Sequence, residues 1–172
     1  MLIRNATESD YPAICRLIHD REELFRVYPR GRYPLTVEQL AELAKQRREL
    51  RVGEVDGRVV AFANFYKFVP RRYTFIGNVI VDRDYRGQGL GQRLIKHMLK
   101  LAFAEHYLPE VRISVFTDNT AALLLYGRLG FQPYALEERQ APGGAATALL
   151  HMRIARAGRH QGWTKGDNSV IL

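Results

Sequence analysis

The chain contains little cysteine and no long apolar run. Its 172 residues include one cysteine, Cys15, so an internal disulfide and a cysteine-rich metal site are both excluded. No apolar stretch approaches the roughly 20 residues that a membrane-spanning helix needs. No apolar segment of signal-peptide length follows the first charged residue near the N-terminus. We therefore expect a cytoplasmic protein that does not enter a membrane.

Metal ligands in a recognisable pattern are also lacking. The sequence has five histidines without paired ligand spacing, namely His19, His97, His106, His151 and His160. We expect no bound metal.

The net charge of the chain is strongly positive. The formal net charge is +8 at pH 7, which suits an anionic partner such as a nucleotide, a nucleic acid or an acidic protein. Basic clusters such as Lys45 to Arg51 and Arg71 to Arg72 are more often solvated surface than binding patches. No recognition-helix or zinc-finger pattern favours nucleic acid. A nucleic-acid partner is therefore not expected.

The length and the 47% hydrophobic content indicate one globular domain with a sizeable core. We place this domain at residues 1–155. Residues 156–172 are polar and rich in glycine, and we expect a flexible C-terminal tail there.

The first half of the domain alternates helical and strand patterns. We expect a strand at 2–5, a helix from Tyr11, a loop at 26–34 and a helix capped by Thr36, with Gln39 completing a capping box. Asp56-Gly57 between two β-rich arms predicts a hairpin. The apolar run 74–81 predicts a further strand of the same sheet.

The second half continues with a helix from near Gly89 to about His106 and a strand at 111–116. A helix at 120–129 ends at Gly130, a left-handed C-cap, and strands at 131–136 and 148–154 close the domain. The order predicts a mixed α/β fold (α+β) with helices on both faces of the sheet.

Three glycines, Gly87, Gly89 and Gly91, precede the long helix at every second position. Bare backbone at a helix N-terminus lets several N–H groups approach one anion, which predicts a phosphate site with Arg86 and Arg93 at its rim. A dinucleotide fingerprint needs glycine where Gln92 stands, and no mononucleotide P-loop is present. Tight packing of helix on strand is the alternative reason for the glycines.

The segment Arg86 to Gly91 resembles the Q/R-x-x-G-x-G/A signature of the GNAT superfamily of acyl-coenzyme A-dependent N-acyltransferases. The segment Asp118 to Phe131 resembles its second hallmark, an asparagine followed by a helix that bears a tyrosine and ends in Leu-Gly-Phe. The order of elements is similar to the family fold over residues 1 to 155. The resemblance implies a central, mostly antiparallel sheet that is splayed at the cofactor site.

The resemblance also implies the residues that bind acetyl-CoA. The backbone of the strand at Val79, Ile80 and Val81 would pair with the pantetheine arm. The pyrophosphate would rest on the signature turn, made of Arg86, Gly87, Gln88, Gly89, Leu90, Gly91 and Gln92. Asn119 would contact the cofactor, and it is also a natural helix N-cap.

Tyr126 matches the family tyrosine that acts as general acid. Coenzyme A leaves as a thiolate when an amine attacks the thioester, and a nearby phenol can protonate it. The alternative for Tyr126 is a half-buried core aromatic. The general base is left unnamed, because Ser114 stands where some family members have a glutamate.

The acceptor pocket is expected around Tyr28 to Tyr33 and near Phe65 and Tyr66, of which only one can face a given side of the sheet. The implied function is transfer of an acetyl group from acetyl-CoA to a primary amine of a small molecule or protein. The alternative is a non-catalytic module that senses acyl-CoA or binds nucleic acid. A homodimer is left open.

Overall fold

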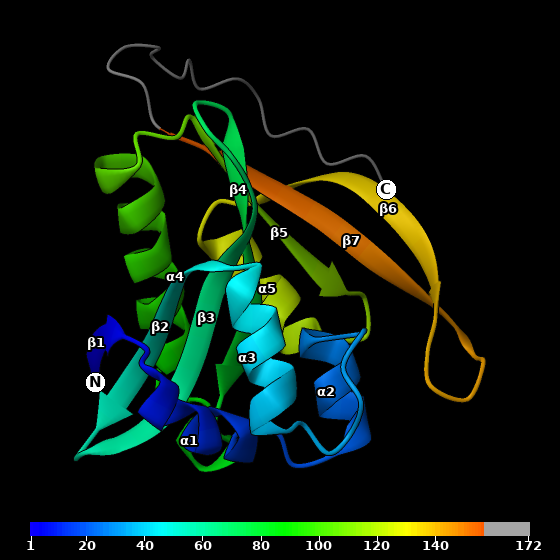
Figure 1. Cartoon of the computed structure of the whole chain (residues 1–172). Coiled ribbons are helices and arrows are strands. Elements are labelled where there is room, and N and C mark those ends of the chain that lie inside the picture. The colour runs from blue at the N-terminus through cyan, green and yellow to red at the C-terminus, as the bar shows by residue number, and fades with distance from the viewer. Residues whose placement is uncertain (157–172) are drawn as a thin grey trace, which may run out of the picture.

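Seven strands form one sheet in the computed structural model, which describes residues 1–156 (Figure 1). Their spatial order is β1-β2-β3-β4-β5-β7-β6, and every neighbouring pair is antiparallel except β4 and β5. The strands are β1 (Leu2–Asn5), β2 (Arg48–Val55), β3 (Arg58–Val69), β4 (Tyr73–Val81), β5 (Glu110–Phe116), β6 (Gln132–Gln140) and β7 (Ala146–Ala155). The mostly antiparallel sheet is confirmed. The tail predicted at the C-terminus lies, from residue 157 onward, outside the described residues.

Helices cover both faces of the sheet, as predicted (Figure 1). The helices are α1 (Tyr11–Arg16), α2 (Arg21–Val27), α3 (Val37–Lys45), α4 (Leu90–Lys100) and α5 (Thr120–Arg128). Residues of α1, α2 and α3 form one apolar cluster with the sheet, and residues of α4 and α5 form the other. The expected long helix to His106 is α4 followed by a π-helical turn, Leu101–Glu105.

The sequence prediction missed α2. Its first residue follows Asp20, whose carboxylate accepts a hydrogen bond from the Glu23 amide at 2.8 Å and so caps the helix. Seven residues are too few for a clear helical period. The predicted loop therefore begins only after Val27.

The turns predicted at Asp56-Gly57 and at Gly130 are confirmed. Asp56 (φ 49°) and Gly57 (φ 77°) join β2 to β3 as the hairpin prediction required, and Gly130 (φ 92°) follows α5. Thr36 caps α3 by accepting from the Gln39 amide at 3.3 Å. The Gln39 side chain, however, bonds the 28–36 loop rather than completing the capping box.

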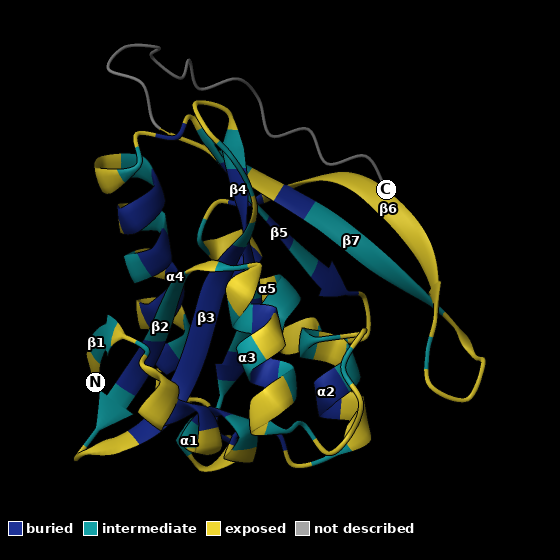
Figure 2. Cartoon of the chain, in the orientation of Figure 1, coloured by how far each residue is buried: buried dark blue, intermediate teal, exposed yellow. Residues whose placement is uncertain are grey.

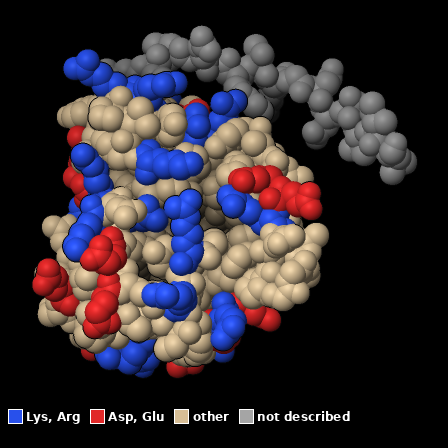
Figure 3. Space-filling model, turned by 45° about the vertical axis from the view of Figure 1, so that its right-hand side comes forward, with Lys and Arg blue, Asp and Glu red and all other residues tan. Residues whose placement is uncertain are grey.

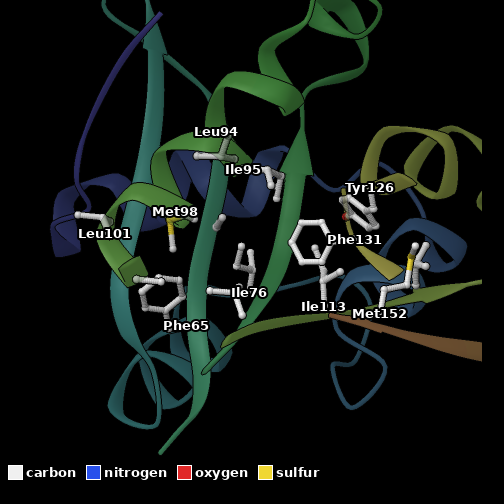
Figure 4. Packing of buried hydrophobic residues seen from close by; sticks show 14 of the residues in the cluster. Phe65, Ile76, Leu94, Ile95, Met98, Leu101, Ile113, Tyr126, Phe131 and Met152 are labelled. Carbon is white, nitrogen blue, oxygen red and sulfur yellow. The ribbon is translucent and has the colours of Figure 1, made fainter. Parts of the chain in front are cut away.

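More than half of the residues of β3 and of β4 are buried (Figure 2). Leu94, Ile95 and Met98 of α4 pack over Phe65 and Ile76 on one face of the sheet (Figure 4). All five side chains are almost fully buried. Burial on this scale stabilises by about 1.5–3 kcal/mol per large apolar side chain. This cluster holds the N-terminus of α4 against β4.

The ion pair of Asp10 with Arg4 joins the first helical turn to β1. Two hydrogen bonds of 2.8 Å link the groups, and Asp10 also accepts from Thr7. The Arg4 guanidinium holds the pKa of the Asp10 carboxyl well below its usual range, so the unfolded chain binds more protons in acid. The stabilisation is complete above the unfolded pKa of about 4 and is lost as pH falls through the folded pKa.

Replacing Asp10 with asparagine is expected to lower the free energy of unfolding by about 2 kcal/mol at pH 7, because charge-assisted hydrogen bonds are lost. Below pH 4 the difference from the wild type should shrink. Urea unfolding at pH 7 and pH 3 measures the difference in unfolding free energy at each pH. Glu42→Gln, at an exposed residue, is the control. An equal difference at both pH values would contradict this role.

Candidate functional site

β4 separates from β5 halfway along its length. The two strands pair in parallel from Tyr73↔Glu110 to Ile76↔Ile113, and in the described part of the chain no pair follows Ile76. Residues 77–81 of β4 keep their pairing with β3, where Ile80 lies opposite Phe62. One edge of β4 is therefore open to a ligand over the segment that contains Val79, Ile80 and Val81. The predicted splay is confirmed.

A β-bulge at Asn78 accompanies the splay. Between the pairs Phe62↔Ile80 and Asn64↔Gly77, β4 has one residue more than β3. Asn78 adopts a positive φ of 49°, and its side chain accepts from Asn64 Nδ2 at 2.9 Å and donates to the Val27 carbonyl at 2.8 Å. Both asparagines are buried, so these bonds fix the bend of β4 against α2.

The glycine turn follows β4 through the short 3₁₀ helix η2 (Arg83–Tyr85). Gly87 and Gly89 have φ of 75° and 76°, and a Cβ at either would meet nothing within 4 Å. The left-handed backbone, rather than crowding, therefore requires glycine at both positions. Gly89 is the N-cap of α4, whose first-turn N–H groups have no intrahelical acceptors. These amides form the positive end of an eleven-residue helix.

A cavity of about 770 Å³ runs along the open edge of β4 to this turn. We call it the glycine cavity. Of the residues predicted to bind the cofactor, it is lined by Val79, Ile80, Val81, Arg86, Gly87, Gly89, Leu90, Gly91, Gln92, Asn119 and Tyr126. Residues of α2 and of the segment between α1 and α2 form its other wall.

A second cavity of about 960 Å³ lies beside it, between α3, the β4–β5 region and the β6–β7 hairpin. We call it the arginine cavity after its lining. Val79, Asn119 and Tyr126 line both cavities. A donor in one and an acceptor in the other would therefore meet at Tyr126.

Tyr126 lies on α5 with 5% of its surface exposed, and its ring packs 5.9 Å from that of Phe131 (Figure 4). Burial raises the pKa of its phenol, which keeps the proton in place at neutral pH. Its hydroxyl has no hydrogen-bond partner among the described residues. A protonated donor without a partner at the junction of two cavities is suited to giving a proton to a leaving group.

Residues 13–131 match the acetyltransferase (GNAT) family. The chain belongs to this family. It is 34% identical over 101 residues to N-alpha-acetyltransferase RimI of Mycobacterium tuberculosis, which covers 57% of this chain and 61% of RimI. It is 37% identical over 81 residues, 47% of this chain, to an uncharacterised Mycobacterium leprae protein, ML0378, and covers 21% of it. The chain thus spans less than two thirds of the length of these two relatives.

Solved structures confirm the GNAT fold. A ribosomal-protein-alanine N-acetyltransferase from Brucella melitensis superposes with a TM-score of 0.76 at 22% identity, over 91% of this chain and 100% of that chain. The protein yncA from Salmonella typhimurium, solved with its cofactor acetyl-CoA, gives 0.71 at 18% identity, over 96% and 99% of the two chains.

Arg86 and Gln88, two residues of the GNAT signature, have their side chains engaged within the chain. Arg86 donates to the Val81 carbonyl at 3.0 Å and to Glu23 at 2.8 Å. Gln88 donates to the Asp84 carbonyl at 3.2 Å and does not line the glycine cavity. Arg93, expected at the rim, instead donates to the Met1 carbonyl and lies outside the lining. Of these three residues, only Arg86 therefore lines the glycine cavity.

Sequence reasoning missed the role of Glu23. It is buried, and it accepts from the His19 amide and from the guanidinium groups of Arg83 and Arg86. These bonds join α2 to the turn after β4, and all three side chains belong to residues that line the glycine cavity. The contacts with the two arginines span 60 and 63 residues, and no local pattern reveals them.

Asn119 caps α5, as its alternative role predicted, by accepting from the Ala122 amide at 3.3 Å. Tyr66 lines the arginine cavity, whereas Phe65 is buried on the other face of the sheet, as their alternation required. Among residues 1–156 no group of three metal-ligating side chains occurs. No helix in that range is long and apolar enough to cross a membrane.

Proposed function

We propose that this chain transfers an acetyl group from acetyl-CoA to a primary amine of a small molecule or protein. The observation that carries the proposal is the meeting of the glycine cavity and the arginine cavity at Tyr126. The first is shaped for a phosphate-bearing cofactor, and the second is large enough for an acceptor. Residues 1–155 act as one catalytic domain. Its cytoplasmic location and possible dimerisation stay predictions.

In this proposal the amides of residues 87–92 hold the pyrophosphate at the N-terminus of α4. The open edge of β4 at Val79 to Val81 pairs with the pantetheine arm, although the Val81 carbonyl is already engaged by Arg86. The amine nitrogen attacks the acetyl carbon and gives up a proton to a general base, the carbon–sulfur bond breaks, and Tyr126 gives its proton to the departing thiolate.

Thiol release from acetyl-CoA, with products checked by mass, tests the proposal across amino acids, polyamines, aminoglycosides and peptides. Release of one thiol per acetylated amine is expected for at least one class. Cofactor binding without turnover on any class would contradict the enzyme and favour an acyl-CoA sensor. Salt-dependent DNA binding without turnover would favour the nucleic-acid alternative.

A further inference from the structure

The arginine cavity is lined by more basic than acidic residues. Lys and Arg side chains gather around a hollow in one face of the molecule (Figure 3). Two acidic residues, Glu42 and Glu137, line the cavity. The basic residues lining it are Arg26, Arg30, Arg47, Lys67, Arg112 and Arg139.

Three of these cations are neutralised within the chain. Arg26 pairs with Asp118 at 2.9 Å, Arg112 with Glu110 at 2.6 Å and Arg139 with Glu137 at 3.0 Å. Glu42 pairs outside the lining, with Lys45. Among the described residues, no acidic side chain forms an ion pair with the other three, which are Arg30, Arg47 and Lys67.

Arg47 is the most deeply placed of the three unpaired cations. Its guanidinium lies 5.1 Å from the centre of the Tyr66 ring, and its Nε is buried without a hydrogen-bond partner among the described residues. Burial lowers the pKa of this guanidinium. Burial also raises the pKa of the Tyr66 phenol, so Tyr66 offers no negative charge at neutral pH. A half-buried cation without a counter-ion is unfavourable until an anion reaches it.

We propose that the acceptor amine carries an anionic group and that Arg47, stacked on Tyr66, binds this group in the arginine cavity. The planar guanidinium fork matches a carboxylate or a phosphate. With the anion at Arg47, the amine end of the same molecule extends toward Tyr126 at the junction of the two cavities. Polyamines and aminoglycosides would instead meet unpaired positive charge.

The proposal rests on the proposed function, and matched acceptors test it. Amino acids are compared with their carboxamides, and phosphoethanolamine with ethanolamine, in wild type, Arg47→Gln and a control outside the cavity, Arg71→Gln. The anionic member of a productive pair should show at least about tenfold higher kcat/KM, since ion–hydrogen bonds are lost without it. Arg47→Gln should remove this preference, and Arg71→Gln should keep it. The productive pair identifies carboxylate or phosphate.

Equal rates within every pair, or a preference that survives Arg47→Gln, would overturn the proposal. Calorimetric titration of N-acetyl amino acids and their amides, with coenzyme A present, provides a readout without turnover. If the acids bind in an Arg47-dependent way, their amides do not bind and no acceptor is acetylated, the proposed activity is refuted and the anion site at Arg47 is supported. Absence of such binding and of turnover would refute both.

Ser114 gives a second, independent observation, because it begins a chain of hydrogen bonds across three strands. It lies on β5 directly opposite His151 on β7, and its Oγ is 2.8 Å from His151 Nδ1. His151 Nε2 lies 3.2 Å from Glu137 on β6. Other charged or titratable groups around this chain include Arg139, paired with Glu137, and Tyr134, whose ring centre is 6.0 Å from that of His151. The Tyr66 phenol also lies beside the Ser114 hydroxyl. Ser114, His151 and Glu137 all line the arginine cavity.

We infer that His151 accepts the proton of the acceptor amine through Ser114. With Nε2–H donating to Glu137, the imidazole has Nδ1 free to accept from the Ser114 hydroxyl. As the amine nitrogen bonds to the acetyl carbon, its proton passes to Ser114 Oγ and the hydroxyl proton passes to His151 Nδ1. The Glu137 carboxylate stabilises the imidazolium. The base thus lies one strand away from the position where the family resemblance places a glutamate.

Replacing His151 with glutamine should lower kcat at least about 100-fold, with little change in acetyl-CoA affinity. Adding Ser114→Glu to this variant places a carboxylate at the amine and should restore at least about tenfold in kcat. His106→Gln, which lies outside both cavities, is the control. An unchanged kcat in His151→Gln would overturn the relay. So would a folded double variant, checked by thermal unfolding, that is no faster than His151→Gln.

Discussion

Replacing Tyr126 with phenylalanine is expected to lower kcat at least about 100-fold, the lower range for loss of a general acid. The affinity for acetyl-CoA and the melting temperature should stay close to those of the wild type. The reason is that only a hydroxyl without a partner among the described residues is removed, while the packing of the ring on Phe131 remains. A thiol-release assay measures kcat, and calorimetric titration measures the affinity for acetyl-CoA. Thermal unfolding gives the melting temperature.

Tyr11→Phe is the matched control for this variant. Tyr11 is 9% exposed, belongs to the cluster on the other face of the sheet, and lines neither cavity. Its substitution should leave kcat unchanged. If Tyr126→Phe and Tyr11→Phe have the same kcat as the wild type at every pH, Tyr126 does not protonate the leaving thiolate.

Replacing Gly89 with valine is expected to weaken coenzyme A binding at least about 100-fold, which equals the loss of about two charge-assisted hydrogen bonds. The φ of 76° is strained for any residue with a Cβ, at a cost of about 1–2 kcal/mol. Relief of the strain turns the first amides of α4 away from the pyrophosphate. Calorimetric titration with coenzyme A measures the change.

Gly57→Val gives a matched control for the backbone strain. Gly57 has a φ of 77°, and its Cβ would also meet nothing within 4 Å, but it lies in the β2–β3 hairpin away from both cavities. Both variants should lose similar stability in urea, and only Gly89→Val should lose affinity. Equal affinities in the two variants would show that the glycine turn does not hold the cofactor.

Features encoded by a few adjacent residues were predictable from the sequence. Asp56-Gly57 predicted the hairpin and the glycines before Leu90 predicted the start of α4, because glycine at Gly57, Gly87 and Gly89 accommodates the positive φ that each turn requires. The GNAT signature located the turn, although the side chains of Arg86 and Gln88 bond within the chain.

Features that depend on register or on distant charges were not predictable. The bulge at Asn78 is held by Asn64 and by the carbonyl of Val27, which is 51 residues away. The alignment of Ser114 with His151 follows from the register of β5 on β7. No sequence pattern fixes that register to the residue, and a slip of one position would place His151 on the other face.

In the proposed reaction, the acetyl thioester lies between β4 and β5 with its sulfur at Tyr126. A crystal structure with coenzyme A or a non-reactive acetyl-CoA analogue tests it most directly. We expect the pyrophosphate on the amides of residues 87–92, the pantetheine arm along the open edge of β4, and the sulfur within hydrogen-bond distance of the Tyr126 hydroxyl. A cofactor bound elsewhere, or a sulfur remote from Tyr126, would contradict it.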